Sequence, residues 1–117
     1  MVILYGLKTC DTCRAARQYL DERDFRHEFR DVRDDGFSDA ELDAWLAAAG
    51  WEKLVNKSSR TWRELSDADK ADLDADKARA LLKAHPTLLK RPVIDAGRGI
   101  LTVGWDKDVR ATLQAAL

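Results

Sequence analysis

The start of the chain constrains the fold more than any other stretch. A continuous apolar and partly β-branched run occupies positions 2–5 and stops at Gly6, which is typical of a strand buried on both faces of a mixed or parallel sheet. A turn over positions 7–12 follows, and the apolar spacing beyond it predicts a helix over 13–24. A buried strand is therefore expected to pass directly into a helix.

Both cysteines of the chain lie at this junction. Cys10 and Cys13 form a Cys-x-x-Cys pair, and Thr9 or Asp11 is the expected helix cap. A thiol at a helix entrance lies near unpaired backbone N–H groups and the positive end of the helix dipole, and both favour the reactive thiolate. Cys10 would attack an oxidised centre, and Cys13, one turn later, could then attack the mixed intermediate. The alternative is that two small apolar residues simply occupy a buried helix start.

Length and charge narrow the class of protein. A chain of 117 residues is sufficient for one domain. Its net charge is -1 and charges of both signs are interspersed, so we expect no direct nucleic-acid partner and no membrane binding. Neither an apolar run of membrane-spanning length nor an export signal is recognisable, which predicts a cytoplasmic protein. Because cytosolic thiols are kept reduced, the cysteine pair is expected to be reactive rather than a structural crosslink.

The supply of ligands does not favour a metal centre. A structural zinc site is normally closed by Cys and His side chains alone. Only His27 and His85 could join Cys10 and Cys13, and neither histidine is followed by a second one at zinc-finger spacing. We therefore expect no metal and no other bound cofactor.

A second strand is predicted at positions 25–32. The sequence alternates there, with Phe25, His27, Phe29 and Asp31 on one face, and the phenylalanines are expected to turn that face inward.

The middle and the end of the chain are predicted to be mainly helical, apart from a hairpin and an irregular stretch at 51–63. The other predicted elements are a helix opened by the capping box Ser38–Glu41 and ended at Gly50, a short helix capped near Ser66, a helix over 74–85 ended by Pro86, strands at 93–95 and 100–103, and a terminal helix with Val109, Leu113 and Leu117 on its apolar face.

The order of these elements is β-α-β, a helical middle, and β-β-α. It predicts an α/β protein with a thioredoxin-like mixed four-stranded sheet and helices on both faces. We expect one domain, 1–117, that contains a helical insertion over residues 36–86.

Five short motifs follow one another over nearly the whole chain. They are Leu4-Tyr5-Gly6 with Cys10-Asp11-Thr12, Gly50-Trp51-Glu52, Leu54 with Asn56, Thr61-Trp62-Arg63-Glu64-Leu65, and Lys90-Arg91-Pro92. In this order they resemble the arsenate reductase (ArsC)/Spx-like family, and within it the small YffB-type thiol reductase-like proteins. The resemblance implies a thioredoxin-like fold, a nucleophilic Cys10 and a cis peptide before Pro92. It also implies a substrate- or anion-binding role for Arg91, and Thr12 and Arg60 are included as further candidates.

The chain departs from the family pattern in three places. A second arginine of the arsenate reductases is displaced here toward Arg60. A third falls where this chain has Gly104-Trp105-Asp106, with Arg98 in the preceding turn instead, and this departure weakens the case for arsenate as substrate. The family also does not require Cys13, whose presence suggests an internal disulfide state as in Spx-like redox switches.

These residues lead to two functional hypotheses from different classes. The first is a thiol-dependent oxidoreductase that reduces a disulfide, or an oxyanion such as arsenate, with glutathione or a glutaredoxin as electron donor and co-substrate. The second is a non-catalytic redox switch of the Spx type that contacts RNA polymerase. A family member with an inert cysteine pair is a third possibility. In each case we expect a monomer.

Overall fold

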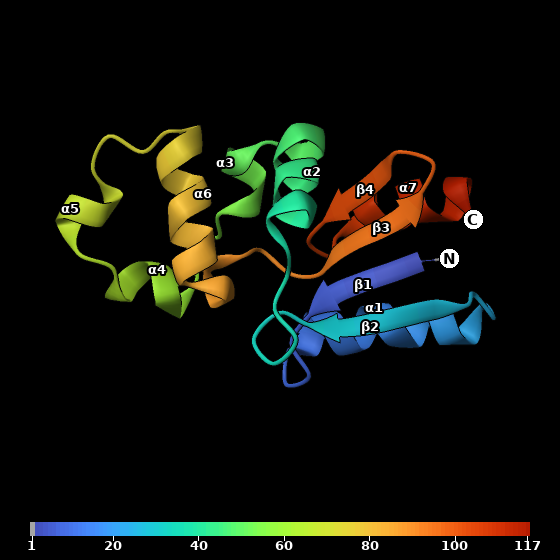
Figure 1. Cartoon of the computed structure of the whole chain (residues 1–117). Helices are drawn as coiled ribbons and strands as arrows, with labels where there is room; N and C mark the ends of the chain where they lie inside the picture. Colours follow the sequence, from blue (N-terminus) through green and yellow to red (C-terminus); the bar gives the residue numbers. More distant parts are fainter. Residues whose placement is uncertain (1) are drawn as a thin grey trace. The chain divides into compact units, whose positions relative to one another are not determined.

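A four-stranded mixed sheet organises the computed structural model, which describes residues 2–117. β1 runs parallel to β2 and antiparallel to β3, and β3 and β4 form the predicted antiparallel hairpin. The thioredoxin-like mixed sheet expected from the sequence is confirmed. The strands are β1 (Val2–Gly6), β2 (His27–Asp31), β3 (Val93–Gly97) and β4 (Ile100–Val103), in the order β2-β1-β3-β4 (Figure 1).

The chain forms two compact units. The sheet unit takes the chain as far as Gly36 and again from Arg91 to Leu117, and the helical unit is Phe37–Lys90. The sheet unit contains α1 (Asp11–Glu22) and α7 (Lys107–Ala116) beside the strands. The helical unit contains α2 (Asp39–Ala49), α3 (Trp51–Leu54), α4 (Arg60–Glu64), α5 (Asp67–Lys70), α6 (Ala75–Ala84) and the 3₁₀ turn η1 (Pro86–Leu88).

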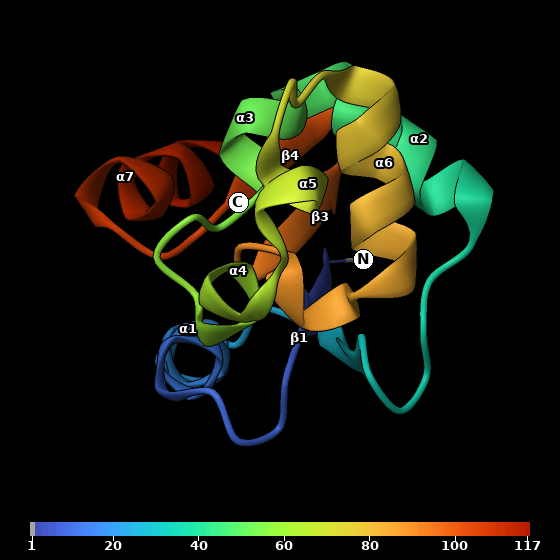
Figure 2. The ribbon, with the colours of Figure 1, turned by 90° about the vertical axis from the view of Figure 1, so that its left-hand side faces the viewer.

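The core of the sheet unit lies between the strands and two helices. Side chains at alternate positions of a strand lie on the same face. In β1, Val2 and Leu4 lie on one face and pack with buried residues of α1, β3 and α7. Figure 2 shows α1 and α7 on the same side of the sheet. The buried cluster consists of Val2, Leu4, Ala16, Leu20, Ile94, Val109 and Leu113. This packing fixes α1, whose first turn carries the cysteine pair.

Helix α1 begins earlier than predicted. Cys10 itself is the N-cap, with extended backbone angles (φ -88°, ψ 122°) and no side-chain cap, and the helix runs over Asp11–Glu22. The first helical hydrogen bond runs from the Arg14 N–H to the Cys10 carbonyl, 3.0 Å. The prediction of Thr9 or Asp11 as cap was therefore wrong, because the turn before the helix places the cysteine at the boundary.

Most predictions for the helical unit are confirmed, including the helix capped at Ser66 and the helix that ends before Pro86, and one is wrong. Ser38 and Glu41 form the predicted capping box: Ser38 Oγ accepts from the Glu41 N–H at 3.0 Å, and Glu41 Oε1 accepts from the Ser38 N–H at 2.9 Å. The stretch predicted as irregular, 51–63, instead contains α3 and the start of α4. Gly50, at φ +85°, ends α2 and precedes α3, and the Ser59 hydroxyl caps α4 by accepting from Trp62 N–H.

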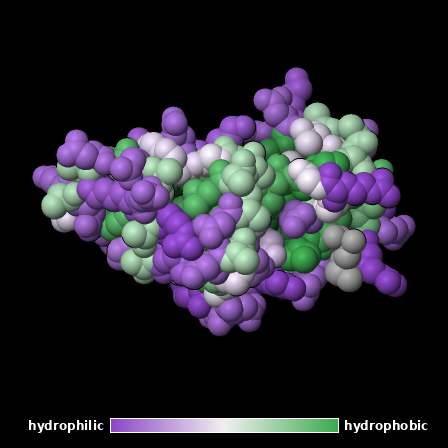
Figure 3. All heavy atoms as spheres, turned by 45° about the horizontal axis from the view of Figure 1, so that its top comes forward, coloured by the Kyte–Doolittle hydropathy of each residue, from purple (hydrophilic) through white to green (hydrophobic). Residues whose placement is uncertain are grey.

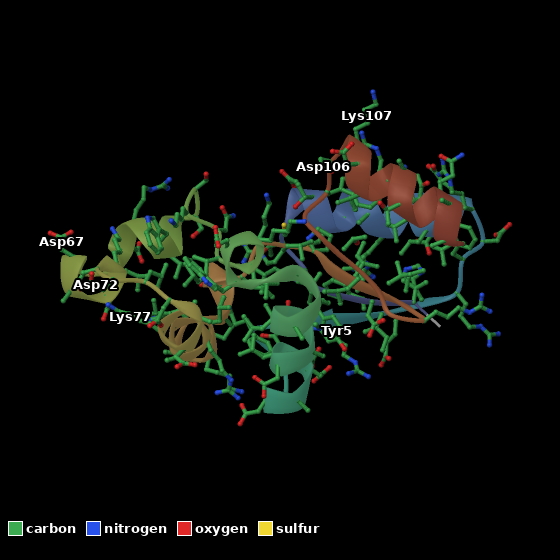
Figure 4. The ribbon with its side chains drawn as sticks, turned by 90° about the horizontal axis from the view of Figure 1, so that it is seen from above. Tyr5, Asp67, Asp72, Lys77, Asp106 and Lys107 are labelled. Carbon is green, nitrogen blue, oxygen red and sulfur yellow. The ribbon has the colours of Figure 1, made fainter. Side chains whose placement is uncertain are left out.

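Polar contacts join the short segments of the helical unit. Lys77 on α6 points back toward the end of α5 (Figure 4), where its Nζ donates to the carbonyls of Ala68 and Ala71. Hydrophilic side chains are spread over the face drawn in Figure 3, with smaller apolar areas between them. Among residues 2–117, each helix is too short or too polar to span a bilayer.

Removal of the capping hydroxyl at Ser38 should weaken the helical unit. A Ser→Ala change at a capping position costs about 1 kcal/mol, because the Glu41 N–H loses the hydroxyl that accepts its hydrogen bond. We expect Ser38→Ala to lower the free energy of unfolding by that amount, and with it the urea midpoint. Ser58→Ala changes an exposed serine that caps no helix and should leave the midpoint nearly unchanged. Equal midpoints for the two variants would contradict the capping assignment.

Candidate functional site

The reactive end of the sheet unit is built by the turn between β1 and α1. The Cys10 N–H donates to the Leu7 carbonyl at 3.1 Å, which closes the turn, and the Cys10 carbonyl accepts the first bond of the helix. Cys10 is half-buried at the position where helix N–H groups lack intrahelical partners. The fold thus places one thiol at the positive end of α1.

Several groups favour the thiolate of Cys10. Partial burial opposes ionisation, but the Thr12 hydroxyl, the backbone and thiol of Cys13 and the charge of Arg91 together outweigh it, so the pKa of Cys10 is lowered. The distance between Cys10 Sγ and Thr12 Oγ1 is 3.0 Å. A thiol with a lowered pKa and partial exposure has the properties of a nucleophile.

Cys13 has the opposite character. Its side chain is fully buried, and burial raises the pKa of its thiol to about 12. The neighbouring Cys10 thiol contributes to the same rise, while the backbone of Leu7 and the charge of Arg91 oppose it. Both cysteines are free thiols. At neutral pH the pair therefore consists of an activated outer thiol and a protonated inner one.

Arg91 brings an unsatisfied donor to the two thiols. Its Nη1 is buried and has no hydrogen-bond partner within the described part of the chain, while its charge lowers the pKa of Cys10. A buried donor without an acceptor is costly, and an oxyanion or carboxylate bound there would satisfy it. The Arg91–Pro92 peptide is cis, as expected, and the Pro92 carbonyl accepts from the Gly104 N–H at 2.9 Å.

Arg60 lies on α4 in the helical unit. Its side chain is 85% exposed, and its Nε donates to Glu64 Oε1 at 2.8 Å. An exposed pair of this kind contributes about 0–1 kcal/mol, so the guanidinium can still exchange Glu64 for another anion. Its anion-binding role stays a prediction.

Sequence reasoning missed two residues next to the cysteine turn. Gly6 leaves room for Cys13, because a Cβ on Gly6 would lie 2.4 Å from Cys13 Sγ. Asp31 is a carboxylate that is only 4% exposed. A carboxylate predicted on the same strand face as Phe25 and Phe29 was the available signal, since buried acids require hydrogen-bond donors. Within residues 2–117, no three His, Cys, Asp or Glu side chains are arranged to hold a metal ion.

Loss of the Thr12 hydroxyl should slow the reaction of Cys10 with iodoacetamide near neutral pH. A hydrogen bond of this kind contributes about 1 kcal/mol. We therefore expect Cys10 of the Thr12→Val variant to be alkylated several-fold more slowly, and the midpoint of its pH–rate profile to move to higher pH. The matched control is Thr9→Val, since Thr9 is exposed and no hydrogen bond joins it to the thiol. A Thr12→Val profile that coincides with that of the wild type would exclude a role for the hydroxyl.

Known proteins resemble the chain in sequence and in structure. The YFFB protein superimposes with a TM-score of 0.90 at 41% identity, covering 100% of this chain and 99% of its own. An arsenate reductase related protein from Brucella melitensis gives a TM-score of 0.75 at 35% identity, covering 97% of this chain and 92% of its own. The global transcriptional regulator Spx of Listeria innocua is 32% identical over 111 residues, which are 92% of this chain and 82% of Spx.

The family assignment rests on most of the chain. The sequence profile of the ArsC family matches residues 5–112, a range that begins on β1 and ends on α7. It therefore includes the cysteine pair, Arg91 and Pro92. The chain belongs to the ArsC family.

Proposed function

We propose that this protein is a thiol-dependent reductase in which Cys10 is the nucleophile and glutathione or a glutaredoxin supplies the electrons. The observation that carries the proposal is the place of Cys10, a partly exposed thiol at the N-cap of α1 with its Sγ 3.0 Å from Thr12 Oγ1; the pKa of this thiol is lowered. The charge of Arg91 acts on the same thiol. This combination suits attack on a substrate that carries negative charge. We place the reaction in the cytoplasm, where glutathione keeps thiols reduced.

The reaction on a glutathione mixed disulfide consumes one free glutathione and releases the substrate thiol and one oxidised glutathione. The Cys10 thiolate attacks the glutathione sulfur, the S–S bond of the substrate breaks, and the departing substrate thiolate takes a proton from solvent. Cys10 then carries a mixed disulfide with glutathione. A thiolate of a second glutathione attacks the glutathione sulfur, oxidised glutathione leaves, and the Cys10 thiolate is regenerated.

Cys13 offers a slower internal route. It could attack Cys10 Sγ and form a Cys10–Cys13 disulfide, but its thiol must first lose a proton. Burial raises the pKa of that thiol to about 12, so few molecules carry the thiolate at neutral pH. We therefore assign the main resolving step to an external thiol and an occasional one to Cys13.

Arg91 would bind the anionic part of the substrate. Its guanidinium can present a fork of N–H donors to a carboxylate of glutathione or to an oxyanion. Thr12 would assist by holding Cys10, and Arg60 is the candidate for a second anion contact. Because the chain lacks the third arginine of the arsenate reductases, we expect a small disulfide to be a better substrate than arsenate.

The test is consumption of NADPH in the presence of glutathione and glutathione reductase, with a glutathione mixed disulfide and arsenate as parallel substrates. Turnover that requires the protein supports the proposal, and the preferred substrate decides between a disulfide and an oxyanion. An assay with a glutaredoxin added tests the alternative donor. The absence of turnover with either substrate and either donor would contradict the proposal.

A second candidate function is a redox switch that contacts RNA polymerase. The observation that favours it is the 32% identity to the regulator Spx together with the Cys-x-x-Cys pair. Such a protein would change its binding to polymerase subunits on oxidation without turning over a substrate. Size-exclusion chromatography of the protein with and without polymerase, in reduced and oxidised form, tests this function and the expected monomer.

A further inference from the structure

Asp31 occupies a special place in the sheet unit. It is the last residue of β2, and in the parallel register of β1 and β2 it lies opposite Gly6, the last residue of β1. The loops that continue from these two strand ends are therefore neighbours. The loop after Gly6 carries Cys10, and carboxyl ends of parallel strands are where open α/β sheets place their reactive loops.

The Asp31 carboxylate joins these two loops. It is 4% exposed and accepts three backbone hydrogen bonds. Oδ2 accepts from the Lys8 N–H at 3.0 Å, and Oδ1 accepts from the N–H groups of Arg33 and Asp34 at 2.8 and 2.9 Å. The Asp31 N–H in turn donates to Asp35 Oδ2 at 2.9 Å. A buried carboxylate needs hydrogen-bond donors, and the three N–H groups of these two loops supply them.

The hydrogen bond between Asp31 and the Lys8 N–H restrains the backbone turn that carries Cys10. Lys8 lies between Leu7 and Cys10 in the turn that the Leu7 carbonyl and the Cys10 N–H close. The turn is therefore held at its first residue by β1 and at Lys8 by Asp31. A second tie, between Lys8 Nζ and Asp34 Oδ2 at 3.3 Å, lies on the surface, where both side chains are more than half exposed.

We propose that Asp31 is a positioning residue for Cys10. By holding the Lys8 N–H, it fixes the turn so that Cys10 Sγ remains within hydrogen-bond distance of Thr12 and close to Arg91. The contribution of Asp31 to reduction rests on the proposed function, but its effect on the reactivity of Cys10 can be measured without any substrate.

The Asp31→Asn variant separates positioning from charge. An Asn oxygen that accepts from Arg33 and Asp34 leaves its NH₂ group facing the Lys8 N–H, so two donors meet and the turn is released. Loss of a negative charge near a thiol, by itself, makes the thiolate easier to form. Loss of position makes it harder, because the partners of Cys10 Sγ move away. The two explanations therefore predict opposite shifts.

The experiment is the pH–rate profile of iodoacetamide alkylation, with the modified cysteine located by peptide mass spectrometry. We expect the midpoint for Cys10 to rise in Asp31→Asn and the rate near neutral pH to fall by roughly three- to tenfold, as for the loss of a hydrogen bond. The matched control is Asp34→Asn, which removes a negative charge and the surface tie to Lys8 but retains the three backbone bonds. The midpoint of its pH–rate profile should equal that of the wild type or lie at lower pH.

A midpoint in Asp31→Asn that is unchanged or lower than that of the wild type would overturn the proposal, even if the variant melts earlier. If Asp31→Asn does not fold, Asp31→Glu decides, because it retains the charge and shifts the carboxylate by one methylene. It should raise the midpoint by a smaller amount, and an unchanged midpoint would count against positioning. A wild-type protein without reductase turnover would contradict the proposed function and leave this measurement valid.

Discussion

Replacement of Cys10 by serine should reduce thiol-dependent turnover to the rate of the uncatalysed reaction. A serine hydroxyl at this position stays protonated, whereas the Cys10 thiol has a lowered pKa, and the thiolate is the attacking species in disulfide exchange. The coupled NADPH assay with a glutathione mixed disulfide measures the loss. Because serine is nearly isosteric, the urea midpoint should change little, which separates lost chemistry from lost structure.

The matched control is Cys13→Ser. Cys13 is buried, and the pKa of its thiol is raised to about 12, so its removal should leave a monothiol reaction that an external glutathione resolves. We expect this variant to retain a large part of the wild-type turnover. Full turnover by Cys10→Ser would refute the assignment of the nucleophile, and an equal loss in both variants would show that the pair acts through a disulfide.

Hydrophobic periodicity is sufficient to predict the elements of the sheet unit. The apolar run at 2–5 and the alternation at 25–32 became β1 and β2, and the predicted hairpin became β3 and β4. β3 continues to Gly97, two residues beyond the predicted strand, so the turn is shorter than the predicted 96–99. The start of α1 was predicted less well, because side-chain capping preferences suggested Thr9 or Asp11. The cap is Cys10, whose place is decided by the backbone bond between its N–H and the Leu7 carbonyl.

The site was predicted from sequence only where a motif marks it. The Cys-x-x-Cys spacing identifies the two thiols, but not the difference between them, which arises from the tertiary burial of Cys13. Arg91 was expected from the family motif alone, and the structure adds that its Nη1 is buried without a partner. Asp31 and Gly6 act through contacts across the sheet, and local patterns do not contain such contacts.

Introduction of a methyl group at Gly6 should destabilise the sheet unit. A Cβ built on Gly6 lies 2.4 Å from Cys13 Sγ and 3.2 Å from Cys13 Cβ, and both partners belong to a side chain that is fully buried on α1. Because close-packed interiors resist added volume, overpacking of this kind costs about 1–3 kcal/mol. We expect the Gly6→Ala variant to show a free energy of unfolding lower by that amount, measured by urea denaturation.

A double-mutant cycle identifies the cause of that loss. Cys13→Ala removes the sulfur and leaves Cys13 Cβ at 3.2 Å and Leu4 Cδ2 at 3.5 Å as the nearest atoms to the new methyl group. In this background Gly6→Ala should cost clearly less than it does in the wild type, so the two changes are non-additive, as expected of groups in contact. Additive losses would mean that the methyl group is accommodated without displacing the sulfur. The burial of the Cys13 thiol would then not depend on a glycine at position 6.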